Sequence, residues 1–339
     1  MSIGQAIVDW YEVNGRDLPW RKTRDPYPIW ISEIVLQQTR IAQGIGYYER
    51  FLGRFPDLKS LAEAHQDEVL KYWEGLGYYS RARNLHAAAK QLMEEYGGVF
   101  PDHYTELLKL KGVGPYTARA IGSFAFENAT GVIDGNVLRV MSRVLNDFSP
   151  IDVPATRKQF QQIVDKWVAP VNSSPFNQGI MDIGSTVCTP SKPGCLICPL
   201  MSYCEGYKQG SVHLLPTKAK KLKRKSRYYH FYLIQNEAKE IIVRQRPAKG
   251  LWGGLWEIPN REIDKNAWDA KEEEEAGAAY IGGLKHVFTH FDMHIQLFTL
   301  IRERSPQWAE GKFISAAAID DYAFAKAVLK IFDRYLDTP

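Results

Sequence analysis

The sequence predicts a protein of two domains, mainly α in its N-terminal part and α+β in its C-terminal part. Three observations support this fold class. Apolar residues recur at helical spacing up to about residue 209, strand-like runs follow residue 228, and a basic stretch lies between them at 218–227. A chain of 339 residues, 45% hydrophobic and 24% charged, is long enough and apolar enough for two cores. We expect a helical domain over 1–209, a basic linker over 210–227 and an α+β domain over 228–339.

Four apolar patterns predict the main helices of the first domain. Residues 29–41 form one pattern, and Tyr27-Pro28 suits its start. Leucines at 107–110 close a second helix before a Gly-Val-Gly-Pro turn, and a third resumes at 116–124. Residues 137–145 are apolar at i, i+3, i+4, i+7 and i+8, which indicates an amphipathic helix.

The sequence of the second domain predicts several strands followed by a terminal helix. Residues 229–234 and 241–243 are β-branched or aromatic runs separated by a short polar turn, which predicts a hairpin. Residues 294–301 predict another strand, and the apolar spacing over 325–336 predicts a final helix. The mixture indicates an α+β domain of about 110 residues.

The charge of the chain is concentrated in one place. The net charge is +4, but residues 218–227 contain seven basic residues, and the rest of the chain carries 36 basic against 39 acidic residues. This segment is either a solvated linker or a contact for a polyanion. No run approaches the ~18 apolar residues of a membrane span, and the first residues lack an export signal. We expect a protein without membrane association, in the cytoplasm.

The four cysteines lie within 17 residues, with the spacing C-x6-C-x2-C-x5-C. Disulfides are disfavoured in the cytosol, and such clustering is typical of a metal centre. Ligation by thiolates alone fits either zinc or an iron–sulfur cluster, and the spacing leaves both open. The predicted ligands are Cys188, Cys195, Cys198 and Cys204.

Three further motifs complete a resemblance to a known family. With the cysteine spacing, residues 110–118 (LKGVGPYTA) and 134–137 (DGNV) resemble the helix-hairpin-helix DNA glycosylases that hold a 4Fe–4S cluster. Residues 30–39 (WISEIVLQQT) narrow the resemblance to the adenine DNA glycosylase (MutY) family, whose second domain is Nudix-like. The resemblance implies a monomer that acts on double-stranded DNA, holds one 4Fe–4S cluster, and removes adenine mispaired with 8-oxoguanine or guanine.

The turn at 110–115 is a candidate phosphate site. Lys111, Gly112 and Gly114 precede a helix, so their backbone N–H groups can bind a phosphate oxygen with the help of the helix dipole. The alternative is an ordinary glycine-capped turn, because G-x-G alone is weak evidence.

Glu33 and Asp134 are the candidate catalytic carboxyls. Glu33 lies among apolar residues in the first predicted helix, which should raise its pKa and suit it to general acid catalysis. Asp134 precedes a helix as an N-cap, and the helix N–H groups should keep it ionised. Each also has a structural reading, as a surface glutamate or a plain cap. The resemblance implies that Glu33 protonates N7 of adenine, that Asp134 stabilises the sugar C1′, and that Asn136 orients Asp134.

Tyr116 bears on the reaction class. The related endonuclease III branch has a lysine there, whose amine forms a Schiff base, whereas tyrosine cannot. We therefore expect a monofunctional glycosylase, with Tyr116 hydrogen-bonding near the sugar and Asp134. The alternatives are a glycosylase/lyase for oxidised pyrimidines, a damage-binding protein without activity, or, for Tyr116 itself, a core aromatic.

The resemblance assigns two more groups of residues to DNA. One group separates the strands and fills the gap left by the extruded base: Gln38, Thr39, Leu76 and Tyr78. The other group lines the adenine pocket: Trp20, Arg21 and Gln178. A plain surface position is the alternative for Tyr78.

The second domain resembles a Nudix fold at 249–259, but the acidic run at 272–275 lacks the Arg-Glu pair of a working hydrolase. We expect this run to be a solvated helix face and the domain to bind without hydrolysing. The resemblance implies that Phe288, Thr289 and His290 detect 8-oxoguanine. The family usually has serine at position 289, so the hydrogen bonding there is open.

Overall fold

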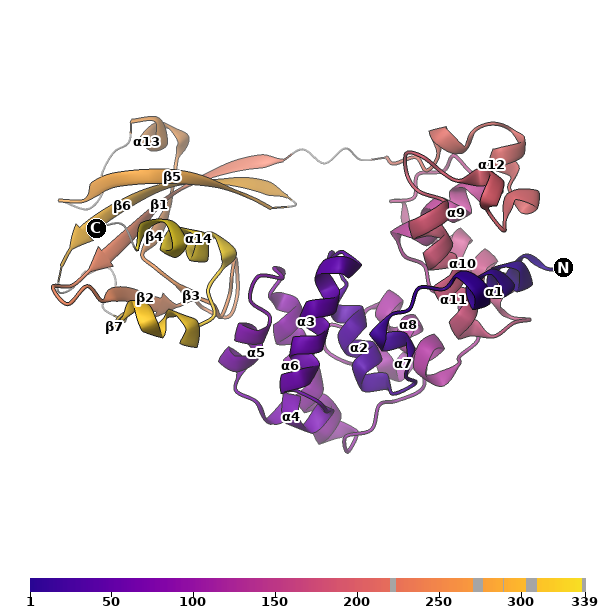
Figure 1. The fold of residues 1–339 in the computed structure, drawn as a ribbon, viewed down its shortest axis with the longest axis horizontal. Helices are drawn as coiled ribbons and strands as arrows, with labels where there is room; N and C mark the ends of the chain where they lie inside the picture. Colours follow the sequence, from indigo (N-terminus) through magenta and orange to yellow (C-terminus); the bar gives the residue numbers. More distant parts are fainter. Residues whose placement is uncertain (220–223, 271–276, 289, 303–309, 337–339) are drawn as a thin grey trace. The chain divides into compact units, whose positions relative to one another are not determined.

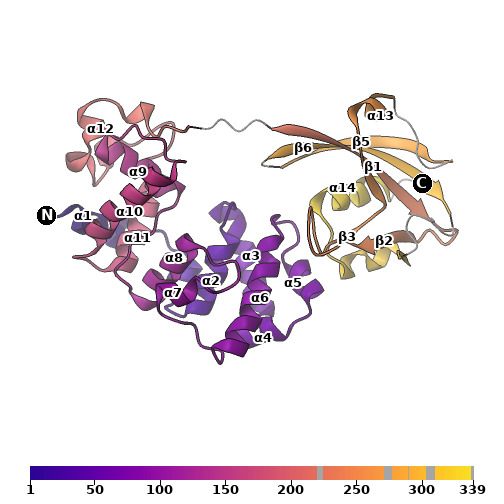
Figure 2. The same cartoon turned by 180° about the vertical axis from the view of Figure 1, so that it is seen from behind.

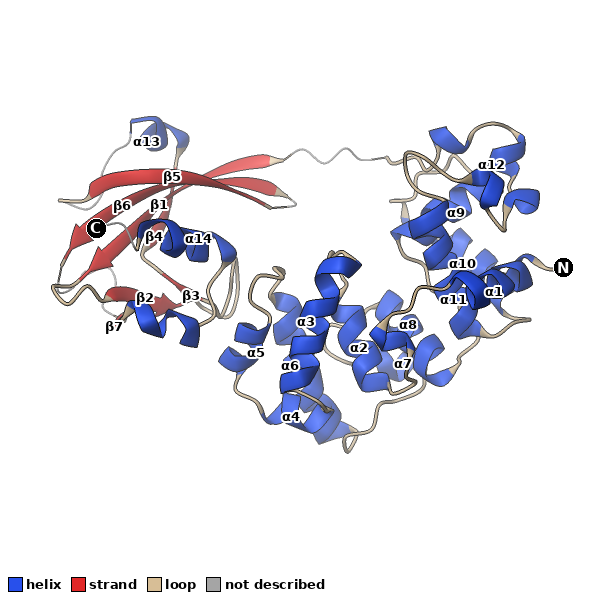
Figure 3. Ribbon diagram, viewed as in Figure 1, coloured by secondary structure: helices blue, strands red, loops and turns tan. Residues whose placement is uncertain are grey.

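The computed structural model describes residues 1–219, 224–270, 277–288, 290–302 and 310–336. The chain divides into two compact units. We call Met1–Ala62 with Ala87–Lys221 the helical unit, and Glu63–His86 with Leu222–Pro339 the sheet unit. In the described part of the chain every strand lies in the sheet unit (Figure 3). The predicted class, mainly α followed by α+β, is confirmed.

The helical unit consists of short and medium helices (Figure 1). Their bounds are α1 (Ile3–Asn14), the 3-10 turn η1 (Pro19–Arg21), α2 (Pro26–Val35), α3 (Ile41–Arg54), α7 (Tyr104–Leu107), α8 (Pro115–Phe126), α9 (Gly135–Leu145), α10 (Pro154–Val168), α11 (Ser173–Asp182) and α12 (Glu205–Lys208). Two more helices cross the division between the units, α4 (Leu58–Glu63) and α6 (Ser80–Glu95).

Local signals in the sequence explain where these helices start. Asp25 caps α2 by accepting from the Tyr27 N–H at 2.9 Å, and Pro26 occupies the first turn, where its missing N–H costs nothing. Asp134 caps α9 by accepting from the Val137 N–H at 2.7 Å. The buried face of α9 follows the predicted apolar spacing.

The prediction of a single helix over 29–41 is wrong. α2 ends at Val35 and α3 begins at Ile41. Between them Gln38 has φ +59°, a left-handed conformation that a right-handed helix cannot continue. The leucines at 107–110 also end their helix early, because α7 stops at Leu107 and the rest form the hairpin turn.

The core of the helical unit joins distant parts of the chain. The N-terminal helix α1 packs against α10 and α11, and the two opposite views agree (Figure 1, Figure 2). A shared apolar cluster fills the space between these helices and α9, and its members include Ile7, Val140, Phe160, Phe176 and Ile180. The N-terminal segment is therefore held against α11 by apolar burial.

The sheet unit is built on a mixed seven-stranded sheet with the order β3-β2-β1-β6-β5, where β4 also pairs with β1 and β7 with β2. The strands are β1 (Lys225–Gln235), β2 (Ile241–Gln245), β3 (Trp256–Glu257), β4 (Asn260–Ile263), β5 (Ala279–Val287), β6 (Phe291–Ile301) and β7 (Lys312–Ile314). β1 and β6 are parallel, and the other pairs are antiparallel. The helices are α5 (Gln66–Tyr72), α13 (Lys265–Ala270) and α14 (Lys326–Tyr335).

The predicted hairpin, third strand and final helix correspond to β1–β2, β6 and α14. β1 begins at Lys225, so the last basic residues of 218–227 already belong to the sheet, and Arg227 pairs with Glu262 of β4. The acidic run at 272–275 and Thr289 lie outside the described residues.

Sequence reasoning did not anticipate that Glu63–His86 clusters with the sheet. Two hydrogen bonds attach this segment to the chain that precedes α14. Lys71 Nζ donates to the Tyr322 carbonyl at 3.1 Å, and the Phe324 N–H donates to Glu74 Oε1 at 2.8 Å. Helices long and apolar enough to cross a membrane are absent from the described residues.

Two glycines test the packing of the helical unit. A Cβ added at buried Gly4 would lie 2.2 Å from the Trp167 carbonyl oxygen of α10, whereas a Cβ at Gly53 in α3 meets nothing within 4 Å. We expect Gly4→Ala to lower the free energy of unfolding by about 1–3 kcal/mol, because backbone must move to make room. Gly53→Ala, the control, should raise it by up to about 1 kcal/mol through helix propensity. Denaturant unfolding of both variants checks this, and equal effects would contradict the packing described.

Candidate active site

The helical unit contains a cavity of about 910 Å³. We call it the central cavity. Its walls come from η1, α2, the turn after α2, the start of α8, the start of α9 and α11. This volume is at the upper end of the range for small-molecule sites. A base with part of its sugar is well within that size.

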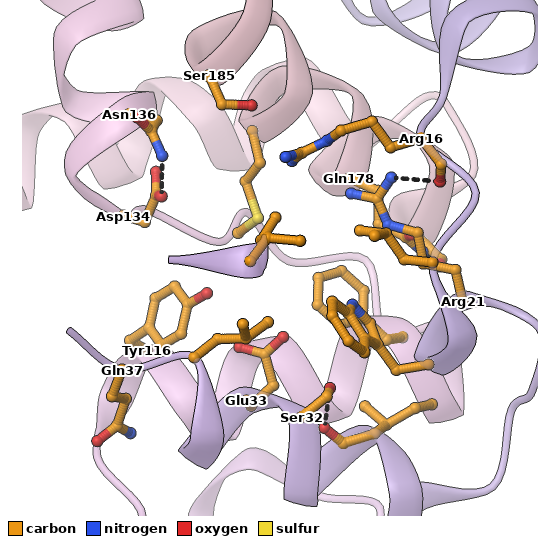
Figure 4. Close-up of a pocket in the computed structure, with 18 of the residues that line it drawn as sticks. Arg16, Arg21, Ser32, Glu33, Gln37, Tyr116, Asp134, Asn136, Gln178 and Ser185 are labelled. Atoms are coloured by element: carbon orange, nitrogen blue, oxygen red, sulfur yellow. Dashed lines mark hydrogen bonds between the residues drawn. The ribbon is translucent and has the colours of Figure 1, made fainter. Parts of the chain in front are cut away.

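The central cavity brings together predicted site residues that lie far apart in the sequence. The predicted site residues that line it are Trp20, Arg21, Glu33, Gln38, Thr39, Tyr116, Asp134, Asn136 and Gln178. Figure 4 shows Glu33 and Tyr116 across the space from Asp134 and Asn136, with Arg21 and Gln178 on a further side. The other predicted residues lie in the hairpin, the cysteine loop or the sheet unit.

Glu33 lies on the buried face of α2, and 8% of it is exposed. Burial raises its pKa to about 7, and the negative charge of Asp134 acts in the same direction. A hydrogen bond from Tyr116 and the charge of Arg21 oppose this rise without cancelling it. A carboxyl with this pKa is partly protonated near neutrality, as a general acid requires.

Asp134 is hydrogen-bonded at the N-terminus of α9. One carboxylate oxygen accepts from the Val137 N–H, and Oδ2 accepts from Asn136 Nδ2 at 2.8 Å. The sequence led us to expect that the helix N–H groups keep Asp134 ionised, and those groups do lower its pKa. Burial is the largest influence and raises that pKa, and these hydrogen bonds offset it only in part.

Tyr116 lies in the first turn of α8, and its hydroxyl is hydrogen-bonded to Glu33. We expected this hydroxyl to lie near Asp134. Burial is the largest influence on the pKa of Tyr116 and raises it, and the negative charges of Glu33 and Asp134 raise it further. The phenol therefore keeps its proton and donates to the Glu33 carboxylate.

Arg139 links the cavity to the cysteine loop, and sequence reasoning missed it. Its Nη2 donates to Asn136 Oδ1 at 2.9 Å, and its Nε donates to the Cys188 carbonyl at 2.8 Å. The available signal was its position three residues after Asn136, on the same face of a predicted helix. Asn136 is thus held by Arg139 while it holds Asp134.

A buried carboxylate, Asp182, was also missed. Arg21 donates to both of its oxygens, each at 2.8 Å, and Arg16 Nε donates to Oδ1 at 2.9 Å. Burial would raise the pKa of Asp182, but the hydrogen bonds and charges of Arg21 and Arg16 lower it below its usual value. Nothing in the sequence around residue 182 indicated an ion pair with residues so distant along the chain.

The four cysteines line a second, largely apolar cavity with residues such as Val140, Val144 and Leu200. None of the four forms a disulfide, and Arg143 Nη1 donates to Cys188 Sγ at 3.2 Å. Within the described ranges, no three His, Cys, Asp or Glu side chains are arranged as a site for a single metal ion. Four cysteine sulfurs around one space could supply the thiolate ligands of either a zinc ion or an iron–sulfur cluster.

The hairpin turn between α7 and α8 contains Lys111, Gly112 and Gly114. Gly112 has φ +77°, and Gly114 is the N-cap of α8. The Lys111 N–H donates to Gln91 Oε1 at 3.1 Å, so this N–H group already has an acceptor within the protein. The N–H groups of Gly112 and Gly114 have no acceptor among the described residues, and they remain available to an anion.

In the sheet unit, the turn before α6 carries Leu76 and Tyr78. Leu76 is buried, whereas Tyr78 is 42% exposed and has φ +48°. Arg81 lies over the Tyr78 ring at 5.7 Å. A second aromatic group surrounds Phe288, which stacks on Phe291 with ring centroids 4.3 Å apart, while His290 is exposed.

Comparison with known proteins agrees with this architecture. Residues 31–170 match the HhH-GPD superfamily of base excision DNA repair proteins, and residues 230–334 match the NUDIX domain. The chain is 34% identical to the adenine DNA glycosylase of Buchnera aphidicola subsp. Schizaphis graminum, over 86% of this chain and 85% of that protein. It is 30% identical to the adenine DNA glycosylase of Mus musculus, over 98% of this chain and 77% of that protein.

A solved structure of a thermostable thymine-DNA glycosylase resembles the chain with a TM-score of 0.56 and 29% identity, over 61% of this chain and 95% of that chain. The fold and the central cavity thus define a DNA-binding glycosylase of the helix-hairpin-helix class with an added Nudix-like domain. Within that class, the chain belongs to the adenine DNA glycosylase family.

Asp182 offers a test of the buried ion pair. Asp182→Asn leaves Arg16 and Arg21 without a counter-charge, so we expect the free energy of unfolding to fall by about 3–5 kcal/mol at neutral pH. Asp17→Asn, the control, breaks a pair whose side chains are 78% and 65% exposed, and should cost less than about 1 kcal/mol. Because the folded pKa of Asp182 is lowered, the difference between wild type and Asp182→Asn should shrink as the pH falls through that pKa. Unfolding at several pH values checks this, and a difference independent of pH would contradict it.

Proposed function

We propose that this protein removes adenine mispaired with 8-oxoguanine or guanine in double-stranded DNA, as a step of base excision repair. The observation that best supports the proposal is the pair of unlike carboxyls in one cavity. Glu33 has a pKa of about 7, and Asp134 is hydrogen-bonded as a helix cap. Glycoside cleavage uses such a pair, one protonated acid and one carboxylate. Membership of the family supports adenine as the base.

The acid step is assigned to Glu33. Its carboxyl donates a proton to N7 of an extruded adenine. The bond between N9 and the sugar C1′ then breaks with its electron pair on the base, so adenine leaves neutral and the sugar becomes an oxocarbenium ion. The buried, apolar residues of α2 around Glu33 favour the protonated form of its carboxyl.

Asp134 is assigned to the sugar. Its carboxylate stabilises the cation at C1′, and a water molecule then adds at that carbon and loses a proton, leaving an abasic site. Asn136, itself held by Arg139, restrains the carboxylate through the 2.8 Å bond to Oδ2. Tyr116 has no amine for a Schiff base, so we propose a monofunctional enzyme.

The remaining helical residues are assigned to substrate binding. We propose that the N–H groups of Gly112 and Gly114, with Lys111, bind a phosphate, and that Trp20, Arg21 and Gln178 contact adenine in the central cavity. Four residues are assigned to the space left in the duplex: Gln38, Thr39, Leu76 and Tyr78. The exposure and left-handed backbone of Tyr78 support its insertion, whereas Leu76 supports the turn from within.

The sheet unit is assigned to recognition of 8-oxoguanine through Phe288, Thr289 and His290. The stacked ring of Phe291 and the nearby ring of Trp252, 5.8 Å away, support Phe288 in this role. We also propose the domain limits 1–209, 210–227 and 228–339, a monomeric state, and an intracellular location with the DNA substrate.

Cys188, Cys195, Cys198 and Cys204 are the proposed ligands of one 4Fe–4S cluster, and their shared cavity fits a group with four thiolate positions. Such a cluster, when bound, supplies four iron–sulfur bonds that cross-link the loop. Arg143 would assist by donating to Cys188 Sγ and to the Thr189 and Pro190 carbonyls, which orients the first ligand.

Glu33→Gln tests the acid. Glutamine keeps the shape of the side chain but cannot donate the proton, so adenine release should fall by about 10²–10⁴-fold. Single-turnover assays on duplexes with adenine opposite 8-oxoguanine, guanine and thymine measure release, and gel shifts measure binding. Wild type should release adenine from the first two only, and Glu33→Gln should still bind them. The control is Glu12→Gln, an exposed position on α1. Full release by Glu33→Gln would contradict the assignment.

The pKa of Glu33 predicts a pH profile. Below about pH 7 the carboxyl is protonated, and above it the acid form falls about tenfold per pH unit. The single-turnover rate should decline above pH 7, and should also decline at low pH, where Asp134, whose pKa is raised, takes up a proton. The residual rate of Glu33→Gln should lack the alkaline decline. A wild-type rate that increases from pH 7 to 9 would exclude Glu33 as the acid.

A further inference from the structure

Tyr11, in α1, belongs to a chain of hydrogen bonds along one wall of the central cavity. Arg21 donates to the buried Asp182, and its guanidinium carbon lies 5.4 Å from the centroid of the Tyr11 ring. The Tyr11 hydroxyl lies 2.7 Å from Gln178 Oε1. Gln178 Nε2 lies 2.8 Å from Ser174 Oγ. Tyr11 and Gln178 both line the cavity.

The direction of these bonds follows from the chemistry of their members. The Tyr11 hydroxyl carries a single proton, and it donates that proton to Gln178 Oε1. A flipped Gln178 amide would present its NH2 group to Tyr11 and leave that proton without its acceptor. Burial raises the pKa of Tyr11, so the hydroxyl keeps the proton at neutral pH. The oxygen of Gln178 is thereby fixed toward Tyr11.

The fixed amide has unused capacity for a ligand. Gln178 Oε1 has a second lone pair, and Nε2 has a second hydrogen, so one acceptor and one donor remain on a side chain that lines the cavity. This pair matches one edge of adenine, where the N6 amino group is a donor and N1 is an acceptor, and it leaves N7 to Glu33. A 6-oxopurine such as hypoxanthine has an acceptor in place of that donor.

We propose that Tyr11 is a positioning residue that sets base specificity by fixing which end of the Gln178 amide accepts. The inference rests on the proposed function, in which Gln178 contacts the extruded base. With Tyr11 present, the amide pairs with adenine and opposes a 6-oxopurine. Without the hydroxyl, the amide is free to flip and pairs with either base.

Tyr11→Phe removes the hydroxyl and keeps the ring. The experiment measures single-turnover release of adenine and of hypoxanthine, each opposite 8-oxoguanine, by the full chain. We expect the ratio of the adenine rate to the hypoxanthine rate to fall about fivefold or more, because a bidentate base contact discriminates by about 5- to 150-fold. Tyr47→Phe is the matched control, since Tyr47 lies in α3 outside the cavity and stacks on Arg50 with the guanidinium carbon 4.4 Å from its ring. It should leave both rates unchanged.

The outcomes separate the inference from the function on which it rests. If wild type fails to release adenine, the proposed function is wrong. If wild type releases adenine and Tyr11→Phe lowers both rates by the same factor, Tyr11 has only a structural role, and the inference is overturned. A fall in the ratio, with an unfolding midpoint close to that of wild type, supports it.

Discussion

The buried carboxylate of Asp182 organises the wall of the central cavity. It lies at the end of α11, and its partners Arg16 and Arg21 come from the segment after α1. A buried carboxylate requires hydrogen-bond donors that compensate for its lost contact with water. Burial of Asp182 therefore holds the segment that carries Arg16 and Arg21 against α11. The position of Arg21 in the cavity is a consequence of that requirement, whereas α1 itself is held against α11 by apolar burial. Arg21 also lies beside the ring of Tyr11, whose hydroxyl donates to Gln178.

The chemistry depends on a second constraint, the removal of water from two carboxyls at once. Burial raises the pKa of both Glu33 and Asp134, and the negative charge of Asp134 makes Glu33 harder still to ionise. Asp134 is compensated by the Val137 N–H and the Asn136 amide, whereas Glu33 has a phenol as its donor. This unequal compensation supports the proposal that Glu33 is the proton donor of the pair.

Much of the site was predictable because its motifs are local. The cap at Asp134 and the glycine turn before α8 depend on residues a few positions apart, and periodicity located both helices. The position of Glu33 among apolar neighbours in α2 likewise indicated burial. The helix boundary at Gln38 was missed, because a single left-handed residue interrupts an apolar pattern that continues on both sides.

Sequence by itself determined the fold class, the cysteine loop, the two carboxyls and the family resemblance, because periodicity, caps and ligand spacing are properties of short segments. Only the tertiary structure decided which distant groups meet. Asp182 with its two arginines, Tyr11 with Gln178, and Arg139 with the cysteine loop are contacts across long stretches of chain. The pKa of Asp134 was decided there too, because desolvation depends on everything packed around a group and a cap depends only on its own helix.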